Sequence, residues 1–215
     1  MKIELRNISK KYNGLEVLRN INLEVLDSGI TCIYGESGCG KTTLLNIMGL
    51  IETCNSGEIY YDGNLILKEK DKRMLLRNKI SFIFQNFGLV DDITVIDNIR
   101  LAKKNEKLNS IEIENALQRF GLVNITRRKI YELSGGEQQR VALVKAYLKD
   151  TDIIFADEPT ASLDDANMKI VMNMLKEFSN EGKTVVIVTH NKEVRNYCEY
   201  KIDLSALNKV IESDK

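Results

Sequence analysis

A glycine-rich loop between an apolar segment and a helical segment constrains the fold of this chain more than any other feature. Residues 35–43 read GESGCGKTT and fit the pattern G-x-x-x-x-G-K-[ST]. Residues 30–34 are typical of a short buried strand, and residues 43–48 open a helical pattern. Glycines let successive backbone N–H groups point at one anion, and the helix N-terminus adds its positive dipole end. These surroundings favour a phosphate-binding loop for a nucleoside triphosphate over an ordinary glycine-rich turn.

Each position of this loop is a candidate nucleotide ligand. Lys41 would reach the β- and γ-phosphates, and the Thr42 hydroxyl would ligate Mg²⁺. The candidate nucleotide-binding residues of the loop are Gly35, Glu36, Ser37, Gly38, Cys39, Gly40, Lys41, Thr42 and Thr43.

Composition excludes several other classes of protein. The 215 residues suffice for one sizeable domain, and we interpret residues 1–215 as a single domain. Lysine plus arginine and aspartate plus glutamate both number 31, so a net charge of zero gives no reason to expect nucleic acid as a partner. No apolar run is long enough to span a membrane, and the four cysteines show neither metal-ligand spacing nor a disulfide framework. The N-terminus alternates apolar and charged residues, unlike a secretion signal, so we expect a cytoplasmic protein.

Changes of hydrophobic period predict an α/β fold with two additions. Residues 3–5 and 21–25 alternate apolar and polar side chains, which favours a half-exposed antiparallel sheet near the N-terminus. Between residues 95 and 120, apolar residues recur at helical spacing. We interpret about residues 87–149 as an α-helical subdomain inserted into the nucleotide-binding fold.

The second half of the chain alternates helices and strands. Helical patterns cover about residues 136–149 and 165–179, and apolar strands are expected at residues 153–156 and 184–188. Such alternation indicates a parallel sheet flanked by helices.

Two further segments carry chemistry. An apolar strand ends in Asp157 and Glu158, where one carboxylate can hold Mg²⁺ through water and the next can orient or deprotonate an attacking water. Residues 133–140 read LSGGEQQR, in which a serine and two glycines open a helix and create a second anion site, or simply cap the helix. Because one nucleotide does not need two such sites in one chain, we expect this loop to contact nucleotide bound to another copy.

The order of these motifs resembles the ATP-binding cassette (ABC) ATPases along almost the whole chain. Residues 133–140 match the signature motif of that family. Tyr12 lies where the family places an aromatic that stacks on adenine, and Gln85 matches the glutamine that senses Mg²⁺ and the attacking water. Asp164 matches the loop that crosses the dimer interface, although it can also cap the next helix. His190 matches the switch histidine that contacts the γ-phosphate.

The resemblance implies a P-loop NTPase fold and a set of residue roles. Two copies would sandwich two ATP molecules head to tail, so that each ATP lies between the phosphate loop of one copy and the signature segment of the other. The implied catalytic residues are Glu158, His190, Gln85 and Lys41. The implied Mg²⁺-binding residues are Thr42, Gln85 and Asp157. The implied nucleotide ligands beyond the phosphate loop are Tyr12, Ser134, Gly135, Gly136, Glu137 and Asp164.

The process that ATP hydrolysis drives is indicated by one segment of the chain. The segment around Gln85 and residues 92–99 resembles the lipoprotein-release, macrolide-export and bacteriocin-export subgroup. The resemblance implies an ATPase on the cytoplasmic face of the membrane that drives a separate permease. Export of a peptide, lipoprotein or drug-like compound is the expectation, and the cargo itself is not readable from the chain. The alternative is a soluble cassette that acts on ribosomes or nucleic acid; the single cassette unit and the zero net charge disfavour it.

Overall fold

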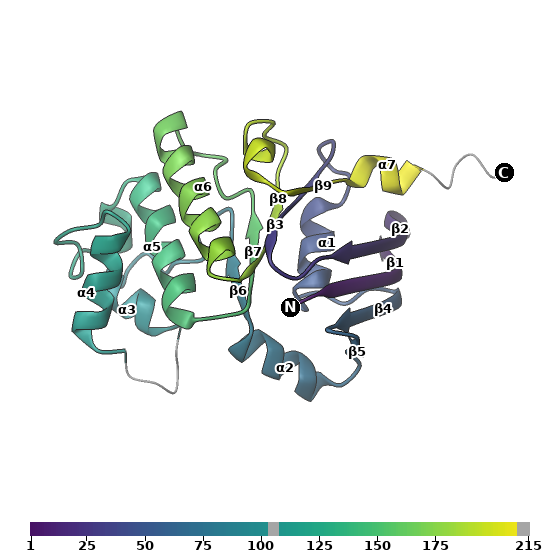
Figure 1. Cartoon of the computed structure of the whole chain (residues 1–215), viewed down its shortest axis with the longest axis horizontal. Coiled ribbons are helices and arrows are strands. Elements are labelled where there is room, and N and C mark those ends of the chain that lie inside the picture. The colour runs from purple at the N-terminus through teal and green to yellow at the C-terminus, as the bar shows by residue number, and fades with distance from the viewer. Residues whose placement is uncertain (103–107, 210–215) are drawn as a thin grey trace.

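Two sheets organise the molecule (Figure 1). The computed structural model describes residues 1–102 and 108–209. The first sheet is antiparallel, with strand order β2-β1-β4-β5. The second sheet is parallel, with strand order β6-β7-β8-β3-β9. The strand bounds are β1 (Ile3–Tyr12), β2 (Leu15–Val25), β3 (Gly29–Tyr34), β4 (Ser56–Tyr61), β5 (Asn64–Leu65), β6 (Ile80–Ile83), β7 (Ile153–Asp157), β8 (Thr184–Val188) and β9 (Tyr200–Asp203).

Helices cover both faces of the parallel sheet. Helix α1 and the antiparallel sheet lie on one side, and α3, α4, α5 and α6 lie on the other. The helix bounds are α1 (Lys41–Met48), α2 (Glu69–Asn78), α3 (Val95–Arg100), α4 (Ser110–Arg119), α5 (Gly135–Lys149), α6 (Asp165–Asn180) and α7 (Leu204–Lys209), with 3-10 turns at Ile130–Glu132 and Val194–Tyr197.

Strand β7 shows why the central strands read as continuous apolar runs. Ile153 and Phe155 face the cluster built on α1 and the antiparallel sheet, whereas Ile154 and Ala156 face the cluster built on α5 and α6. All four side chains are at most 1% exposed. Because both faces of a parallel sheet are covered, alternating polar positions disappear from its strands.

The predicted architecture is confirmed, and two helices went unpredicted. The antiparallel sheet, the helical segments after residue 87 and the alternating second half are all present; residues 103–107 of the helical block lie outside the described residues. The missed helices are α2, in which Leu75 is the buried residue, and the short α7. Neither carries a wide apolar stripe, so hydrophobic periodicity does not reveal them.

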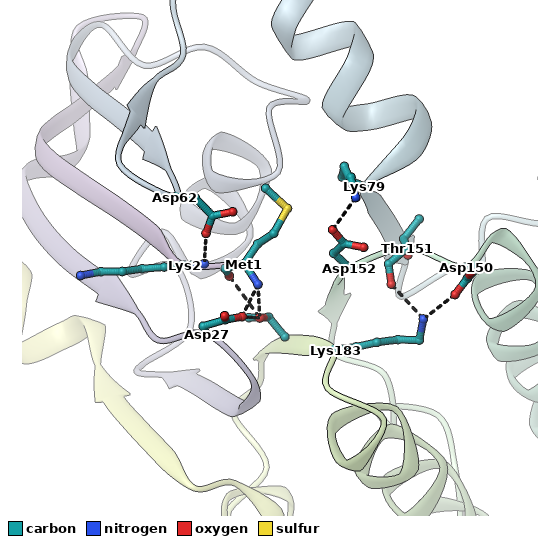
Figure 2. A network of polar contacts seen from close by, with 10 residues as sticks. Met1, Lys2, Asp27, Asp62, Lys79, Asp150, Thr151, Asp152 and Lys183 are labelled. Atoms are coloured by element: carbon teal, nitrogen blue, oxygen red, sulfur yellow. Dashed lines mark hydrogen bonds and ion pairs between the residues drawn. The ribbon is translucent and has the colours of Figure 1, made fainter.

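Polar contacts gather at the amino ends of the central strands (Figure 2). Lys79 Nζ lies 2.7 Å from Asp152 Oδ2, and Lys183 Nζ lies 3.0 Å from Asp150 Oδ1 and 3.0 Å from the Thr151 carbonyl oxygen. The α-amino group of Met1 pairs with Asp27. In each of these pairs the carboxylate is solvent-accessible, and such ion pairs contribute little to stability. They lie at the edge of the sheet opposite the phosphate loop, so they take no part in the site described below.

A buried asparagine fixes the chain that leaves β6. Asn98 on α3 is fully buried; its Nδ2 donates to the Val90 carbonyl at 2.9 Å and to the Thr94 carbonyl at 3.2 Å. Its Oδ1 accepts from the Val90 N–H at 2.8 Å. The side chain therefore pairs both backbone groups of Val90 and holds the segment that follows Gln85.

Asn98→Ala is expected to lower the free energy of unfolding by about 2 kcal/mol, because both backbone groups of Val90 and the Thr94 carbonyl lose a hydrogen-bond partner. The matched control Asn115→Ala, at an exposed position of α4, is expected to change it by about 0.5 kcal/mol or less. Urea unfolding followed by circular dichroism compares the two. Equal losses in both variants would contradict the role given to Asn98.

Candidate active site

The predicted loop residues meet around one pocket at the carboxyl ends of the parallel strands. Parallel strands direct the residues that follow them to one edge of the sheet, where α/β proteins place their ligands. The pocket has a volume of about 660 Å³. It is lined by Tyr12, Val17, Gly35, Glu36, Ser37, Gly38, Gly40, Lys41, Thr42, Thr43, Gln85, Glu158 and His190.

The phosphate loop has a backbone that requires glycine. Gly40 has φ +95°, and a Cβ atom there would come within 2.8 Å of Leu18 Cδ2. The Lys41 ammonium donates to the carbonyl oxygens of Gly35 at 3.0 Å and Glu36 at 2.8 Å. The lysine side chain thus lies across its own loop and presents its charge at the pocket that the loop surrounds.

Helix α7 braces the loop from behind. The Glu36 N–H donates to Ser205 Oγ at 2.9 Å. Asn208 Nδ2 donates to the carbonyl oxygens of Cys39 and Val17, each at 3.1 Å. Sequence reasoning missed Ser205 and Asn208 as positioning residues, because a helix of six residues without a motif carries no signal for this role.

Cys39 differs from its neighbours in the loop. Its side chain is half-buried and packs against the apolar cluster around α1, outside the set of residues that line the pocket. A Cβ atom added at Gly35 would lie 2.7 Å from Cys39 Sγ, so the thiol fills the space behind the loop. The loop positions therefore divide into those that face the pocket and one that supports it.

Oxygen donors suited to Mg²⁺ come together beside Lys41. Thr42 Oγ1 donates to Asp157 Oδ1 at 3.1 Å, and Gln85 lines the same pocket. Burial raises the pKa of Asp157 above its ordinary value, while the hydrogen bond from Thr42 opposes this shift. A hydroxyl, a carboxylate and an amide oxygen form a donor set of the kind that Mg²⁺ prefers.

The Glu158 carboxylate is held by the chain that follows β8. Its Oε2 accepts from Thr189 Oγ1 at 2.8 Å, and its Oε1 accepts from the His190 N–H at 3.0 Å. His190 Nδ1 lies 2.6 Å from the same Oε1. Glu158 has φ +45°, a left-handed conformation that is costly for a residue with a side chain and is found most often at functional sites.

Tyr12 stands at the rim of the pocket with a tethered hydroxyl. The ring is 41% exposed, its OH donates to Glu52, and Lys10 Nζ lies 5.0 Å from the ring centroid. Lys10 also pairs with Glu52 at 2.9 Å. These contacts orient the ring, and an exposed, oriented aromatic face is able to stack on a base.

The signature segment lies apart from the pocket of its own chain. Ser134 and Glu137 form a capping box at the start of α5: the Glu137 carboxylate accepts from the Ser134 N–H and Oγ, each at 2.8 Å. Ser134 and Gly135 are exposed, and neither lines the pocket described above. Gly136 lies beside Asn167, since a Cβ atom there would be 2.8 Å from Asn167 Oδ1.

Asp164 is coupled to this segment. Its carboxylate caps α6 by accepting from the Asn167 N–H at 2.7 Å. The Asn167 side chain accepts from Arg140 Nη1 at 2.8 Å and donates to Asp164 Oδ2 at 3.0 Å. The prediction that Asp164 caps a helix is confirmed. Through Asn167, Asp164 is also joined to Arg140 of the signature segment, and both segments are expected at a dimer interface.

Relatives match the chain over nearly its whole length. The family described as ABC transporter matches residues 18–161. The ABC transporter ATP-binding protein MJ1508 of Methanocaldococcus jannaschii is 38% identical over 212 residues, which cover 94% of this chain and 95% of that protein. The lipoprotein-releasing system ATP-binding protein LolD of Aquifex aeolicus is 37% identical over 198 residues, which cover 89% of this chain and 88% of LolD. The macrolide export ATP-binding/permease protein MacB of Neisseria meningitidis is 36% identical over 89% of this chain, which corresponds to 31% of MacB.

A solved structure of the same architecture carries nucleotide. The dimeric post-hydrolysis state of the ATP-binding cassette MJ0796, bound to ADP and Pi, superimposes with a TM-score of 0.84 at 32% identity and covers 94% of each chain. None of the helices in the described parts of our chain is both long and apolar enough to cross a membrane. The predicted family and cassette fold are confirmed by these matches. The chain belongs to the ABC transporter family, as one of its ATP-hydrolysing cassettes.

Proposed function

We propose that this cassette is the ATPase subunit of an exporter, in which two copies close on two ATP molecules and drive a separate membrane permease. The observation that carries the proposal is that the signature segment lies outside the pocket: Ser134 and Gly135 are exposed and line no part of it. A second copy supplies the missing contact. Dimeric structures of the relative MJ0796 support this arrangement.

The γ-phosphate joins the two copies. Signature-segment N–H groups at the start of α5 form an anion site, and Ser134 and Gly135 at that end of the helix are exposed. In the closed dimer these groups reach the γ-phosphate held by the partner's loop. Hydrolysis and loss of phosphate remove the contact, so the dimer opens.

Catalysis depends mainly on position and charge. Lys41 neutralises the phosphates, Tyr12 stacks on adenine, and Gln85 orients the attacking water. Thr42, Gln85 and Asp157 would hold Mg²⁺, which supplies further neutralisation of phosphate charge when bound. We also propose that residues 1–215 form a single domain, with an α-helical subdomain inserted at about residues 87–149.

Glu158 accepts the proton of the attacking water. Its carboxylate is held by Thr189 and by the His190 backbone, so its direction is set before nucleotide arrives. His190 is the exposed member of the pair, with 68% of its side chain accessible, and it lines the pocket while its Nδ1 contacts Glu158. The short separation of the two side chains lets them act on the same water and phosphate.

Glu158→Gln keeps the shape of the side chain, and its single oxygen can still accept from the His190 N–H while its NH2 group donates to the Thr189 hydroxyl, but the charge that takes the proton is removed. We expect kcat for ATP hydrolysis to fall by about 100-fold or more, while ATP binding is retained and a dimer accumulates. Phosphate release and size-exclusion chromatography with ATP measure the two effects. Turnover near the wild-type rate would refute this role for Glu158.

The proposed exchange of signature segments is tested by mixing two inactive variants. Lys41→Ala disables the phosphate loop. Gly135→Asp places a carboxylate against the γ-phosphate, and the fold has room for it, because a Cβ atom at Gly135 meets only Phe87 Cζ at 3.9 Å. Only the mixed dimer contains one intact loop facing one intact signature segment. An equal mixture should regain up to about a quarter of wild-type activity if each site is shared by two copies. No recovery would contradict a shared site.

The names of two relatives support export as the function of this chain. LolD is an ATP-binding protein of a lipoprotein-releasing system, and MacB unites an ATP-binding part with a permease for macrolide export. We propose that the cassette lies on the cytoplasmic face of the membrane, bound to a permease through its surface near residues 85–97. The cargo would be a peptide, a lipoprotein or a drug-like compound.

Affinity purification from native membranes tests this proposal against the soluble alternative. Tagged Glu158→Gln protein is incubated with Mg-ATP, and its partners are identified by mass spectrometry. We expect a multispanning membrane protein at near-stoichiometric yield. Recovery of ribosomal proteins or nucleic acid alone would favour a cassette acting on ribosomes or nucleic acid.

A further inference from the structure

A second, smaller pocket lies between the chain after β6 and helix α5. Its volume is about 250 Å³. Its wall includes three aromatic side chains and two small side chains of α5: Phe82, Phe84, Phe87, Ala142 and Ala146. The Phe82 and Phe84 rings stack with centroids 5.4 Å apart, so this wall is a continuous apolar surface.

Two lysines complete the wall without a counter-ion. The Lys145 ammonium donates to the Gly88 carbonyl at 3.0 Å, and the Lys149 ammonium donates to the Leu76 carbonyl at 2.8 Å and to that of Ile80. Within residues 1–102 and 108–209, neither lysine forms an ion pair. Burial lowers the pKa of both lysines, and the charge of Lys145 lowers that of Lys149 further.

The Lys145 ammonium has unused hydrogen-bonding capacity. An ammonium has three donors, and the structure pairs one of those on Lys145, with a neutral carbonyl. A half-buried cation without a carboxylate partner is unfavourable, and an added carboxylate would offset that cost. The pocket therefore favours an anionic side chain over a neutral one.

Helix α2 extends the positive charge beside the pocket. Lys70, Arg73 and Arg77 are exposed and share one helical face, and none of them forms an ion pair within the described residues. Helix α2 borders the pocket, because Lys149 bonds to the Leu76 carbonyl of that helix. In a chain whose net charge is zero, this is a local concentration of cations with charge complementary to an acidic partner.

We propose that the permease segment received in this groove is acidic, and that one of its carboxylates pairs with Lys145 while an adjoining apolar side chain packs on Phe84 and Phe87. This inference rests on the proposed function and deepens it by naming the chemistry of the partner. The exposed cations of α2 meet further acidic groups at the rim. A concave, aromatic-walled pocket suits a protein side chain, so the inference commits to a protein partner; binding of anionic lipid by the same cations is an outcome of the test.

The test is zero-length cross-linking of the complex captured from native membranes with tagged Glu158→Gln protein. A carbodiimide joins a carboxylate to a lysine amine in direct contact, with loss of water, and mass spectrometry identifies both peptides. We expect a Lys145 or Lys149 amide to an Asp or Glu of the captured membrane protein. Lys145→Gln in the same background should reduce the recovered membrane protein by about tenfold or more.

Two further variants separate charge from structure. Lys145→Arg should retain the membrane protein but lose any cross-link at position 145, because a guanidinium does not form the amide. Lys176→Gln, at an exposed position of α6, should leave recovery unchanged. Equal melting temperatures and nucleotide binding in all variants exclude unfolding as the cause of a loss.

The outcomes distinguish the inference from the proposed function. If a membrane protein is captured but neither groove lysine is cross-linked and Lys145→Gln recovers as much as wild type, the acidic contact is wrong and the permease proposal stands. If no membrane protein is captured, the permease proposal fails, and the inference fails with it. Vesicle binding tests the α2 cations separately. If the protein binds phosphatidylglycerol but not phosphatidylcholine vesicles, and Arg73→Gln/Arg77→Gln loses this binding, the α2 cations bind lipid. Their proposed pairing with acidic groups of the permease would then be wrong.

Discussion

The register of the parallel sheet is the constraint on which the site depends. Ile33 of β3 and Asp157 of β7 both pair with Val188 of β8, so the three strands end together. The residues that follow them leave the sheet at one edge, which places the phosphate loop, Glu158 and His190 around one pocket. A slip of one residue in this pairing would turn every side chain of the strand to the opposite face and remove the carboxylates from Lys41. The apolar packing of β7 against two cores is what prevents that slip.

The predictable parts of the molecule are those where chemistry restricts residue type. The loop around Lys41 needs glycine for its backbone and a lysine for its charge, so the motif predicted the pocket and most of its lining. Helices α2 and α7 were not predicted, because their positions depend on contacts with distant segments. Asn208 shows this best: it contacts the chain at Val17 and Cys39, and nothing in its neighbourhood along the sequence indicates that role. The contact between Glu158 and His190 was also beyond sequence reasoning, which assigned each a role but no mutual geometry.

Lys41 and Lys145 show the same physical arrangement at two places. Each is a half-buried or buried lysine whose ammonium donates to backbone carbonyl oxygens, and neither forms an ion pair within the described residues. A carbonyl oxygen satisfies a donor but does not neutralise the charge, so each position retains affinity for an anion. At Lys41 the proposed anion is the triphosphate of ATP, and the same physics at Lys145 calls for a carboxylate from outside the chain.

The two lysines are connected by one short segment. Gln85 lines the nucleotide pocket, and Gly88, three residues later, supplies the carbonyl that holds Lys145. Asn98 fixes the far end of this segment at Val90, and Phe87 within it lies against Gly135 of the signature segment. Any displacement of Gln85 by nucleotide must therefore move the wall of the groove or strain a segment anchored at Val90. An acidic partner bound to Lys145 would experience that movement directly, which gives ATP binding a mechanical route to the partner through a few residues of chain.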